Sequence, residues 1–382
     1  MKFFHLSDLH IGLRLLNRDL SEDQAYILKR IQELAVKEKP DAIVIAGDIY
    51  DKAVPSAEAV ELFDHFIAGL SASLPEMTVM LISGNHDSGS RLNCFRSILS
   101  GRNLYMIGLP PRTEEEHIEK VTLTDSFGEV DFYLLPFVRP SMVRQITGTD
   151  DKGNGLSYHD TLRRLLDREQ IDFSRRNVLV SHQFYLPAGK EADQVERMDS
   201  EVRTVGNIDE VRGEILQDFD YAALGHIHKP MQVGSEFCRY CGTPLACSVS
   251  EAGQKKGIVV VELGPKGRRN TRVLPLEPLR QVKVLRGTLE EILDQGCEDY
   301  VTAVLTDTGD LDVLDMQDRM RAAFPRLLEI RRETWRKAAY DSEVAAEEEM
   351  DPFSLCCSFL QETDEEDRQI LRDVIHTVQE VM

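Results

Sequence analysis

The chain has 382 residues, of which 42% are hydrophobic and 29% are charged, and its formal net charge is −21. This length exceeds what one hydrophobic core usually supports, so we expect two or three domains. No apolar run reaches the roughly 18 residues that would span a membrane, which excludes the class of helical membrane proteins. Residues 341–382 hold 13 acidic residues and two arginines, about half of the charge imbalance, so the total does not exclude a nucleic-acid partner for the main body.

The cysteines and the N-terminus predict a cytoplasmic location. Seven cysteines without regular spacing favour a reducing compartment. The first residues enter a strand pattern directly, with no basic-then-apolar signal segment. Cys238 and Cys241 form one Cys-x-x-Cys pair, but a structural zinc site needs a second pair of ligands, which the sequence does not offer.

Strand and helix patterns alternate over residues 1–275. Short apolar segments predict buried strands at residues 2–6, 41–46, 78–82, 177–180 and 221–224. Further strands are predicted at residues 104–107, 121–123, 130–135, 257–263 and 271–274. Amphipathic spacing predicts helices at residues 21–37, 56–70, 88–100, 141–146 and 161–169. This alternation predicts an α/β fold, a β-sandwich flanked by helices, as a first domain of residues 1–275.

Two prolines, Pro275 and Pro278, mark the expected start of a second domain, a small α+β domain of residues 276–340. Strands are predicted at 281–285, 301–305 and 327–330, and helices after the Thr288 capping box and at 315–324. The last third is basic and contains Arg319, Arg321, Arg326, Arg331, Arg332, Arg336 and Lys337, near Trp335. Such a stretch is either a solvated surface or a DNA contact, and both interpretations stay open.

The tail, residues 341–382, is predicted to be an acidic linker followed by two helices, at 353–360 and 365–382. The second helix has an apolar stripe formed by Ile370, Leu371, Val374, Ile375, Val378 and Val381. Two short helices behind a charged linker cannot bury such a stripe by themselves. The stripe therefore needs either a partner protein or the main body of the chain.

Side chains that can bind metal ions follow five of the predicted strands. They are Asp8 and His10, Asp48, Asn85 and His86, His182, and His226 and His228. Ligands of α/β proteins gather at the carboxyl ends of strands. In an extended segment residues i and i+2 point the same way, so Asp8 and His10 are expected side by side.

The set of two carboxylates, an amide and several imidazoles suits two borderline divalent ions such as Mn²⁺. Two ions about 3.5–4 Å apart can clamp the attacking and leaving oxygens of a phosphoryl displacement. The sequence therefore predicts a two-metal phosphodiesterase site.

The motifs Asp8-x-His10, Gly47-Asp48, Gly84-Asn85-His86-Asp87, His182 and Gly225-His226-x-His228 resemble those of the calcineurin-like metallophosphoesterases. Within them, the chain is most similar to the bacterial exonuclease subunits of the double-strand-break repair nuclease branch. Further matching segments are residues 4–12, 83–88, 223–230 and 240–244. Beyond about residue 245 only the order of domains is similar.

The resemblance implies a role for each motif residue. One metal ion would be held by Asp8, His10, Asp48 and His228, and the other by Asp48, Asn85, His182 and His226, with Asp48 bridging. His86 would be the general acid that protonates the leaving 3′ oxygen, with Asp87 fixing its tautomer. Asp51 stands where relatives from other kingdoms often carry a histidine, and we expect it to accept a hydrogen bond behind the site. Arg91 and Arg139 are candidate DNA contacts.

The same resemblance implies an activity and partners. The activity would be that of a nuclease with two Mn²⁺ ions, Mg²⁺ being an alternative, acting as a 3′→5′ exonuclease on duplex ends and an endonuclease on single strands and hairpins. The tail helices would bind an SMC-like ATPase that gates DNA access during DNA repair and recombination. The helices at 56–70 and 88–100 would form a dimer face, within a 2:2 heterotetramer, through Leu62, Phe66, Phe95 and Leu99.

Two other functions stay open at this point. One is a metallophosphoesterase that acts on nucleotides or small phosphodiesters, which has no evident use for the tail. The other is an inert scaffold with this fold, although such proteins usually lack metal ligands and none is missing here.

Overall fold

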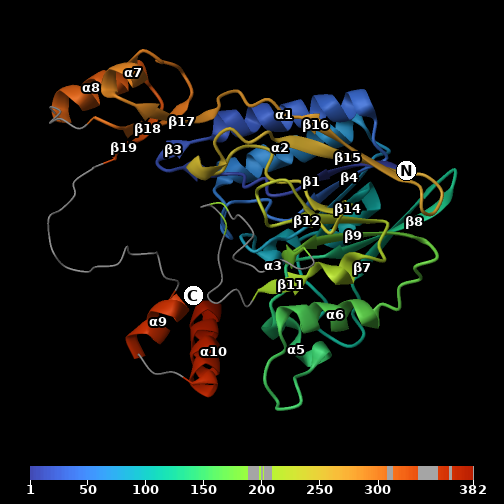
Figure 1. Cartoon of the computed structure of the whole chain (residues 1–382). Helices are drawn as coiled ribbons and strands as arrows, with labels where there is room; N and C mark the ends of the chain where they lie inside the picture. Colours follow the sequence, from blue (N-terminus) through green and yellow to red (C-terminus); the bar gives the residue numbers. More distant parts are fainter. Residues whose placement is uncertain are drawn as a thin grey trace.

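Two six-stranded sheets stack face to face in the main body (Figure 1). The computed structural model describes residues 1–187, 198, 201, 209–307, 313–333, 352–360 and 364–381. The first sheet has the order β16-β15-β1-β4-β5-β6. Its strands are β1 (Lys2–Leu6), β4 (Ala42–Ala46), β5 (Thr78–Ile82), β6 (Leu104–Ile107), β15 (Gly257–Leu263) and β16 (Arg269–Pro275). Strands β1, β4, β5 and β6 are parallel, whereas β15 and β16 pair antiparallel at the other edge.

The second sheet has the order β13-β14-β12-β9-β8-β7. Its strands are β7 (Glu119–Asp125), β8 (Gly128–Leu135), β9 (Arg176–His182), β12 (Tyr221–Gly225), β13 (Met231–Val233) and β14 (Ser235–Tyr240). The inner strands β8, β9, β12 and β14 are parallel, and antiparallel strands form both edges. Two small sheets pair β2 (Arg14–Leu15) with β3 (Arg18–Asp19), and β10 (Phe184–Leu186) with β11 (Glu210–Arg212).

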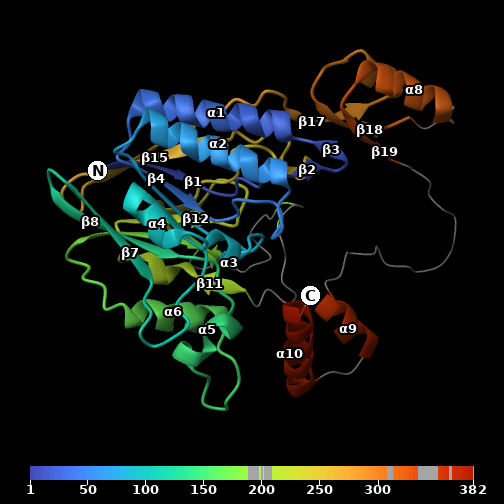
Figure 2. The ribbon, with the colours of Figure 1, turned by 180° about the vertical axis from the view of Figure 1, so that it is seen from behind.

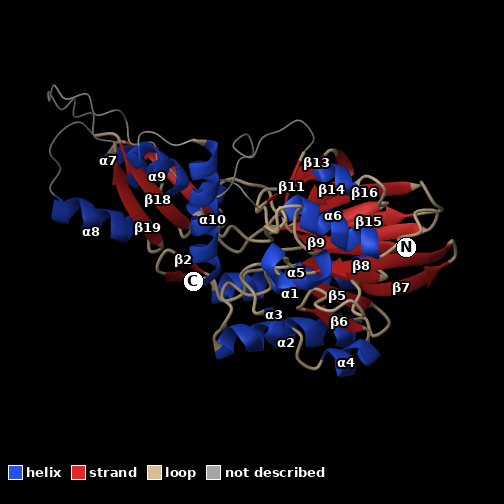
Figure 3. Ribbon diagram, turned by 90° about the horizontal axis from the view of Figure 1, so that it is seen from below, coloured by secondary structure: helices blue, strands red, loops and turns tan. Residues whose placement is uncertain are grey.

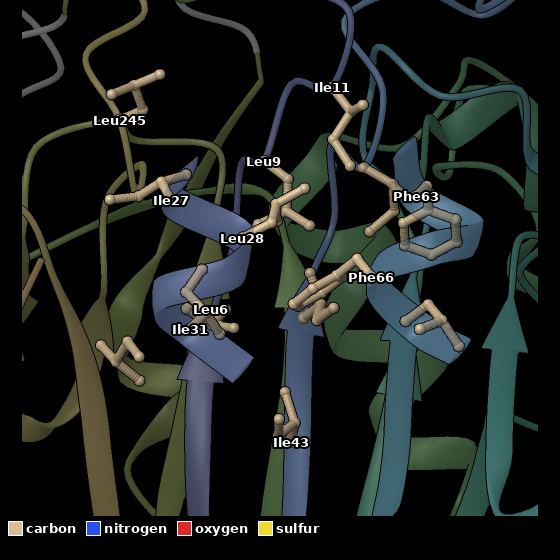
Figure 4. Close-up of a cluster of buried hydrophobic side chains, with 14 of the residues drawn as sticks. Leu6, Leu9, Ile11, Ile27, Leu28, Ile31, Ile43, Phe63, Phe66 and Leu245 are labelled. Atoms are coloured by element: carbon tan, nitrogen blue, oxygen red, sulfur yellow. The ribbon is translucent and has the colours of Figure 1, made fainter. Parts of the chain in front are cut away.

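Helices cover the outer face of each sheet, which completes the sandwich (Figures 1 and 2). Helices α1 (Ser21–Glu38) and α2 (Ala57–Ser73) lie on the first sheet, and α5 (Pro140–Thr147) and α6 (Tyr158–Arg168) on the second. Figure 4 shows Leu6 and Ile43 of the first sheet packed against Ile31 of α1 and Phe66 of α2. A separate apolar cluster, which includes Phe3, fills the space between the two sheets. Strands β4, β5, β9 and β12 are buried on both faces, as their continuous apolar runs predict, and the predicted sandwich is confirmed.

The predicted helix 88–100 is wrong, because the segment forms two single turns, α3 (Gly89–Leu92) and α4 (Arg96–Leu99), followed by a 3₁₀ turn at Ser100–Arg102. Phe95 separates the turns with a left-handed backbone at φ 60°, which no continuous right-handed helix tolerates. The apolar residues of segment 88–100 are nevertheless spaced as in a helix, which explains the wrong prediction. Phe66, expected on a dimer face, is only 2% exposed and belongs to the core beneath α2, so it cannot contact a partner.

A separate three-stranded parallel sheet, β17 (Val282–Gly287), β18 (Tyr300–Leu305) and β19 (Leu327–Arg332), lies beside the sandwich (Figure 3). Helices α7 (Leu289–Leu293) and α8 (Val313–Ala323) pack on it around their own apolar cluster. The predicted capping box is present, since Thr288 Oγ1 accepts from the Glu291 amide while Glu291 Oε2 accepts from the Thr288 amide. The domain boundaries after residues 275 and 340 stay predictions.

The tail contains α9 (Pro352–Leu360) and α10 (Glu365–Val381), which pack together where the Arg372 guanidinium lies 4.9 Å from the centre of the Phe353 ring. Ile370 and Val374 of the apolar stripe are more than half exposed. Most of the predicted linker, together with Trp335, Arg336 and Lys337, lies outside the described residues. Among the helices that the structure describes, none combines the length and the apolar character needed to cross a bilayer.

Candidate metal centre

The loops that follow β1, β4 and β5 meet the ends of β9 and β12 at one edge of the sandwich. These loops and strand ends carry the predicted metal ligands Asp8, His10, Asp48, Asn85, His182, His226 and His228. Six of the seven are at least 95% buried, and Asn85 is half-buried. The structure therefore brings together residues that are up to 220 positions apart in the sequence.

The first group of side chains consists of Asp8, His10 and His228. The Nε2 atoms of His10 and His228 lie 3.1 Å apart, and one ligand atom from each of the three residues lies within 4.8 Å of the others. Two imidazole nitrogens that face each other compete for one proton or share one cation. With a carboxylate beside them, they form the start of a cation-binding shell.

The second group lies beside the first and contains Asp48, Asn85, His182 and His226. His182 Nε2 lies 3.3 Å from Asp48 Oδ2 and 3.0 Å from Asn85 Oδ1, and His226 Nδ1 lies 2.9 Å from the same amide oxygen. Asp48 Oδ2 is also 3.7 Å from His10 Nε2. This carboxylate oxygen thus lies between the two groups.

Four of these residues have backbone conformations that non-glycine residues rarely adopt. Asp8, His10, Asp48 and His226 have φ angles of 53°, 42°, 48° and 105°. Such strain costs of order 1–3 kcal/mol per residue and clusters at functional sites. Strand β1 ends at Leu6, as predicted, and the side chains of Asp8 and His10 lie together as expected, but the backbone of both residues is left-handed and not extended.

Two motif glycines allow the loops to approach this closely. A Cβ atom on Gly84 would lie 2.1 Å from Asp48 Oδ1. A Cβ atom on Gly225 would lie 1.9 Å from the Ala46 carbonyl oxygen and 2.8 Å from His182 Nδ1. These distances are far below van der Waals contact, so any side chain at either position would push the loops apart. The glycines of the motifs thus have a packing role.

Burial and charge set the protonation of the site. Burial lowers the pKa of His10 to about 3, so its imidazole is neutral. Burial alone would raise the pKa of Asp48, but the nearby His182 and His10 hold it well below its usual range. Burial likewise disfavours charge on His182, yet the Asp48 carboxylate raises the pKa of His182 to about 9. A charged carboxylate and a neutral imidazole are the forms that bind divalent cations, and a cation would displace the proton of His182.

The residues fit divalent metal ions. The donors are buried carboxylate oxygens, an amide oxygen and imidazole nitrogens, a mixture typical of Mn²⁺, Fe²⁺ and Zn²⁺ sites. His182 Nδ1 lies 2.8 Å from the Ala46 carbonyl, so it donates there and leaves Nε2 for a cation. His10 Nδ1 is buried without a hydrogen-bond partner among the described residues, 3.9 Å from Asp51 Oδ1.

The predicted contact between His86 and Asp87 is wrong. Asp87 instead accepts hydrogen bonds from the amides of Ile49, Tyr50 and Gly84, because these three donors surround its carboxylate. The Nδ1 atom of His86 lies 3.0 Å from the backbone carbonyl of Asp51. A backbone group of the loop after β4 thus orients His86, and Asp87 joins that loop to the loop after β5.

The two candidate DNA contacts lie outside both groups of ligands. Arg91 is exposed on α3, four residues after Asp87. Arg139 is half-buried and follows Phe137, whose ring lies 6.3 Å from that of His182. Both arginines are therefore close in sequence to residues of the centre, and their contact with DNA stays a prediction.

One residue that supports the site, Gln24, was not predicted from the sequence. Gln24 of α1 is 4% exposed, and its Nε2 atom donates to the His10 carbonyl oxygen at 2.7 Å while its Oε1 accepts from the Gly12 amide at 2.9 Å. The available signal was its place on the apolar stripe of α1, three residues before Ile27. A polar residue on a buried helix face needs hydrogen-bond partners.

Comparisons with known proteins agree with this geometry. The family model described as calcineurin-like phosphoesterase matches residues 1–230, and the model described as type 5 capsule protein repressor C-terminal domain matches residues 275–364. Proteins named as the SbcD component of nuclease SbcCD, from Staphylococcus epidermidis and Staphylococcus saprophyticus, are 32% and 34% identical to this chain. These alignments cover 86% and 78% of this chain and 84% and 75% of the relatives.

A dimetal phosphatase of known structure from Danio rerio overlaps 74% of this chain and 99% of its own, with 15% identity and a TM-score of 0.41. That overlap adds nothing to the assignment, which depends on the matches in sequence. From the motifs and these matches, the chain belongs to the calcineurin-like phosphoesterases, which are metal-dependent hydrolases, and within them to the SbcD family of nucleases.

Proposed function

We propose that the chain is the DNA-cutting subunit of a nuclease complex and that it hydrolyses phosphodiester bonds at the edge of the sandwich described above. The observation that carries this proposal is the convergence of seven metal-competent side chains on two adjoining groups. The first ion would be held by Asp8, His10, Asp48 and His228, and the second by Asp48, Asn85, His182 and His226. When bound, two such cations, Mn²⁺ or alternatively Mg²⁺, neutralise the phosphodiester and activate water.

His86 serves as the general acid. Its Nδ1–H donates to the Asp51 carbonyl at 3.0 Å in both protonation states, which fixes the ring orientation. The second proton, on Nε2, passes to the leaving 3′ oxygen, after which His86 is neutral and keeps the Nδ1–H tautomer. The half-buried ring stacks edge-on against His10 at 4.9 Å, so the acid stands directly beside the first group.

The experiment that tests the proposal is a comparison of His86→Ala with the wild type. We expect the variant to bind Mn²⁺ with the wild-type stoichiometry but to lose about 10²- to 10⁴-fold in kcat on duplex DNA, the usual contribution of a general acid. His65→Ala, at an exposed position of helix α2, is the matched control and should cut DNA normally. Cleavage by His86→Ala at the wild-type rate would show that the acid assignment is wrong.

The substrate class is tested separately. We propose 3′→5′ exonuclease activity on duplex ends and endonuclease activity on single strands and hairpins, which serve in DNA repair and recombination. The second domain and the tail favour a macromolecular substrate over a nucleotide. A protein that hydrolyses a chromogenic phosphodiester but leaves linear duplex, hairpin and single-stranded DNA intact would instead be a small-molecule phosphodiesterase.

The second domain is proposed to cap the site and to contact DNA. Arg91 and Arg139 are also proposed to contact DNA. The basic stretch of the second domain offers limited support, since several arginines are already paired: Arg319 with Glu290 at 2.7 Å, Arg331 with Glu329 at 2.7 Å, and Arg326 with Glu298. DNA phosphates would have to replace these surface carboxylates. The free energy lost by breaking such exposed ion pairs is small, since each contributes about 0–1 kcal/mol to stability.

The partner is proposed to be the SMC-like ATPase SbcC, bound by α9 and α10, in a cytoplasmic 2:2 complex associated with the nucleoid. The exposed stripe residues Ile370 and Val374 support a docking role for α10. Removal of all residues after Tyr340 should abolish co-purification with the ATPase while preserving Mn²⁺ binding. Equal recovery of the ATPase with the truncated chain would remove this assignment.

A further inference from the structure

We infer that Glu251 is a positioning residue for the metal centre: it fixes the tautomer of His228, so that the Nε2 atom is unprotonated and faces Asp8 and His10. Glu251 belongs to the 3₁₀ turn Val249–Glu251, outside every motif discussed above. The inference rests on the metal centre of the proposed function, and it adds a residue without which the first ion would be held weakly.

The two ring nitrogens of His228 face different surroundings. Nε2 lies 3.1 Å from His10 Nε2, in the first group of ligands. Nδ1 lies 3.3 Å from Glu251 Oε1, on the opposite side of the ring. Both side chains are buried, with 2% and 0% of their surfaces exposed, so water does not compete for either contact.

The Glu251 carboxylate is itself held in place by a buried polar network. Its Oε2 atom accepts from Lys256 Nζ at 2.6 Å and from Thr243 Oγ1 at 2.9 Å, while Oε1 also accepts from Ser248 Oγ at 3.1 Å. The Lys256 side chain is 5% exposed. A buried lysine at this distance keeps the glutamate charged, and a charged glutamate can only accept a hydrogen bond from His228.

The tautomer of His228 follows from this arrangement. Because Glu251 accepts, Nδ1 carries the hydrogen, and the lone pair of Nε2 is left for a cation. A carboxylate behind a histidine ligand also orients the ring and raises its basicity, and the loss of such a partner typically weakens metal binding roughly 10- to 100-fold. His182 reaches the same tautomer through a backbone carbonyl, that of Ala46, whereas His228 depends on a side chain that can be changed.

Glu251→Gln is an informative substitution because Lys256 dictates how the amide must lie. The lysine ammonium has only donors, so the amide oxygen turns toward Lys256 and the NH₂ group turns toward His228. The Nδ1 atom of His228 must then accept, and its proton moves to Nε2, the atom that would bind the cation. The variant keeps the size of the side chain but inverts the tautomer.

The test is Mn²⁺ titration by calorimetry of chelator-stripped protein. We expect Glu251→Gln to bind one ion roughly 10- to 100-fold more weakly and the other ion as in the wild type. Asp220→Asn is the matched control: its carboxylate is also buried and paired with a lysine, Lys266 at 2.7 Å, but lies at the opposite end of β12 from His226. The control should bind both ions normally.

Two double variants separate positioning from folding, because both remove the buried charge pair completely. In Glu251→Gln with Lys256→Met, the amide oxygen is free to face His228, so both ions should bind with nearly wild-type affinity. In Glu251→Met with Lys256→Met, the side chain at position 251 offers His228 no acceptor oxygen, and the loss of affinity for one ion should return. Nitrogen NMR of the metal-free single variant should find the His228 proton on Nε2.

The outcomes distinguish this inference from the proposed function. If the wild-type protein binds no Mn²⁺, the proposed metal centre fails. If the wild type binds two ions and Glu251→Gln binds both with unchanged affinity, the role of Glu251 is overturned. Equal affinity of the two double variants would overturn it as well, even if the single variant does not fold.

Discussion

Single residues bring the candidate ligands together through unusual backbone geometry. The Asp8 amide donates to the Gly47 carbonyl and the His10 amide donates to the Asp48 carbonyl, both at 3.0 Å. These bonds tie the loop after β1 to the loop after β4, and they hold the left-handed conformations of Asp8 and His10 in place. The motif residues could be predicted from the sequence. The left-handed backbone of Asp8 and His10 could not, because tertiary hydrogen bonds determine it. Asp87 was misassigned for the same reason, since three amides from other segments compete for its carboxylate.

Gly84→Ala tests whether close packing at the residue scale shapes the centre. The added Cβ would lie 2.1 Å from Asp48 Oδ1 and 2.5 Å from the Asp48 amide nitrogen, so the loops must separate. Because Asp48 lies between the two groups, we expect the affinity for both Mn²⁺ ions to fall at least tenfold, or about 1.4 kcal/mol per site. Calorimetry measures this change.

Gly101→Ala is the control for that substitution, since its added Cβ would lie within 4 Å of no described atom outside its own turn of the chain. It should leave Mn²⁺ binding unchanged. Wild-type affinity in Gly84→Ala would mean that the contact between Gly84 and Asp48 is not needed for the site.

At the scale of elements, an ion pair joins both sheets at the end opposite the candidate centre. Asp125 ends β7, and its carboxylate accepts from Arg176 of β9 at 2.6 and 3.0 Å and contacts the N-terminal amine before β1.

The predicted strands and most of the predicted helices are present in the structure, because apolar runs and helical spacing are local signals. The missed strands β13 and β14 contain alternating polar residues and prolong a sheet edge, where the sequence carries little apolar signal.

Asp125→Asn should show the pH dependence of that pair. Hydrogen bonds from Arg176 hold the pKa of Asp125 well below its usual range. The stabilisation is therefore complete above the usual aspartate pKa of about 3.9 and is lost as the pH falls below it. At pH 7 we expect the free energy of unfolding to drop by about 2 kcal/mol, the scale of a charged hydrogen bond, measured by urea denaturation.

At pH 3 the difference between Asp125→Asn and the wild type should shrink, because the unfolded wild-type chain then gains a proton on Asp125 that the folded protein does not bind. A constant difference between pH 7 and pH 3 would show that the charge of Asp125 contributes nothing. Asp151→Asn is a suitable control, since Asp151 is exposed in a surface turn.

At the scale of the whole molecule, the centre exists only because two sheets contribute to it. Three of the ligand-bearing loops follow strands of the first sheet, and His182, His226 and His228 lie at the end of the second. Strand order and the pairing of the two sheets leave no local trace in the sequence, so the convergence was predicted only through the motifs. Of the predicted dimer face, Phe66 is buried, Leu62 and Leu99 are half-buried and Phe95 is 74% exposed, so the prediction was in part wrong. Ile98, which was not part of that prediction, is 70% exposed.

Phe95→Glu combined with Ile98→Glu tests the proposed dimer at this scale. Two neighbouring exposed apolar side chains favour a protein contact, and two charges there would oppose it. We expect the dissociation constant of the dimer to rise at least tenfold in sedimentation experiments. Phe127→Glu, at a turn with 56% exposure, should not change the oligomeric state. A double variant that still sediments as a dimer would place the interface elsewhere.

The most direct measurement of the central claim is a crystal structure with Mn²⁺ and anomalous diffraction. The account predicts two peaks, one among Asp8, His10, Asp48 and His228 and the other among Asp48, Asn85, His182 and His226, with Asp48 contacting both. A single peak, or two peaks bound by other residues, would contradict it.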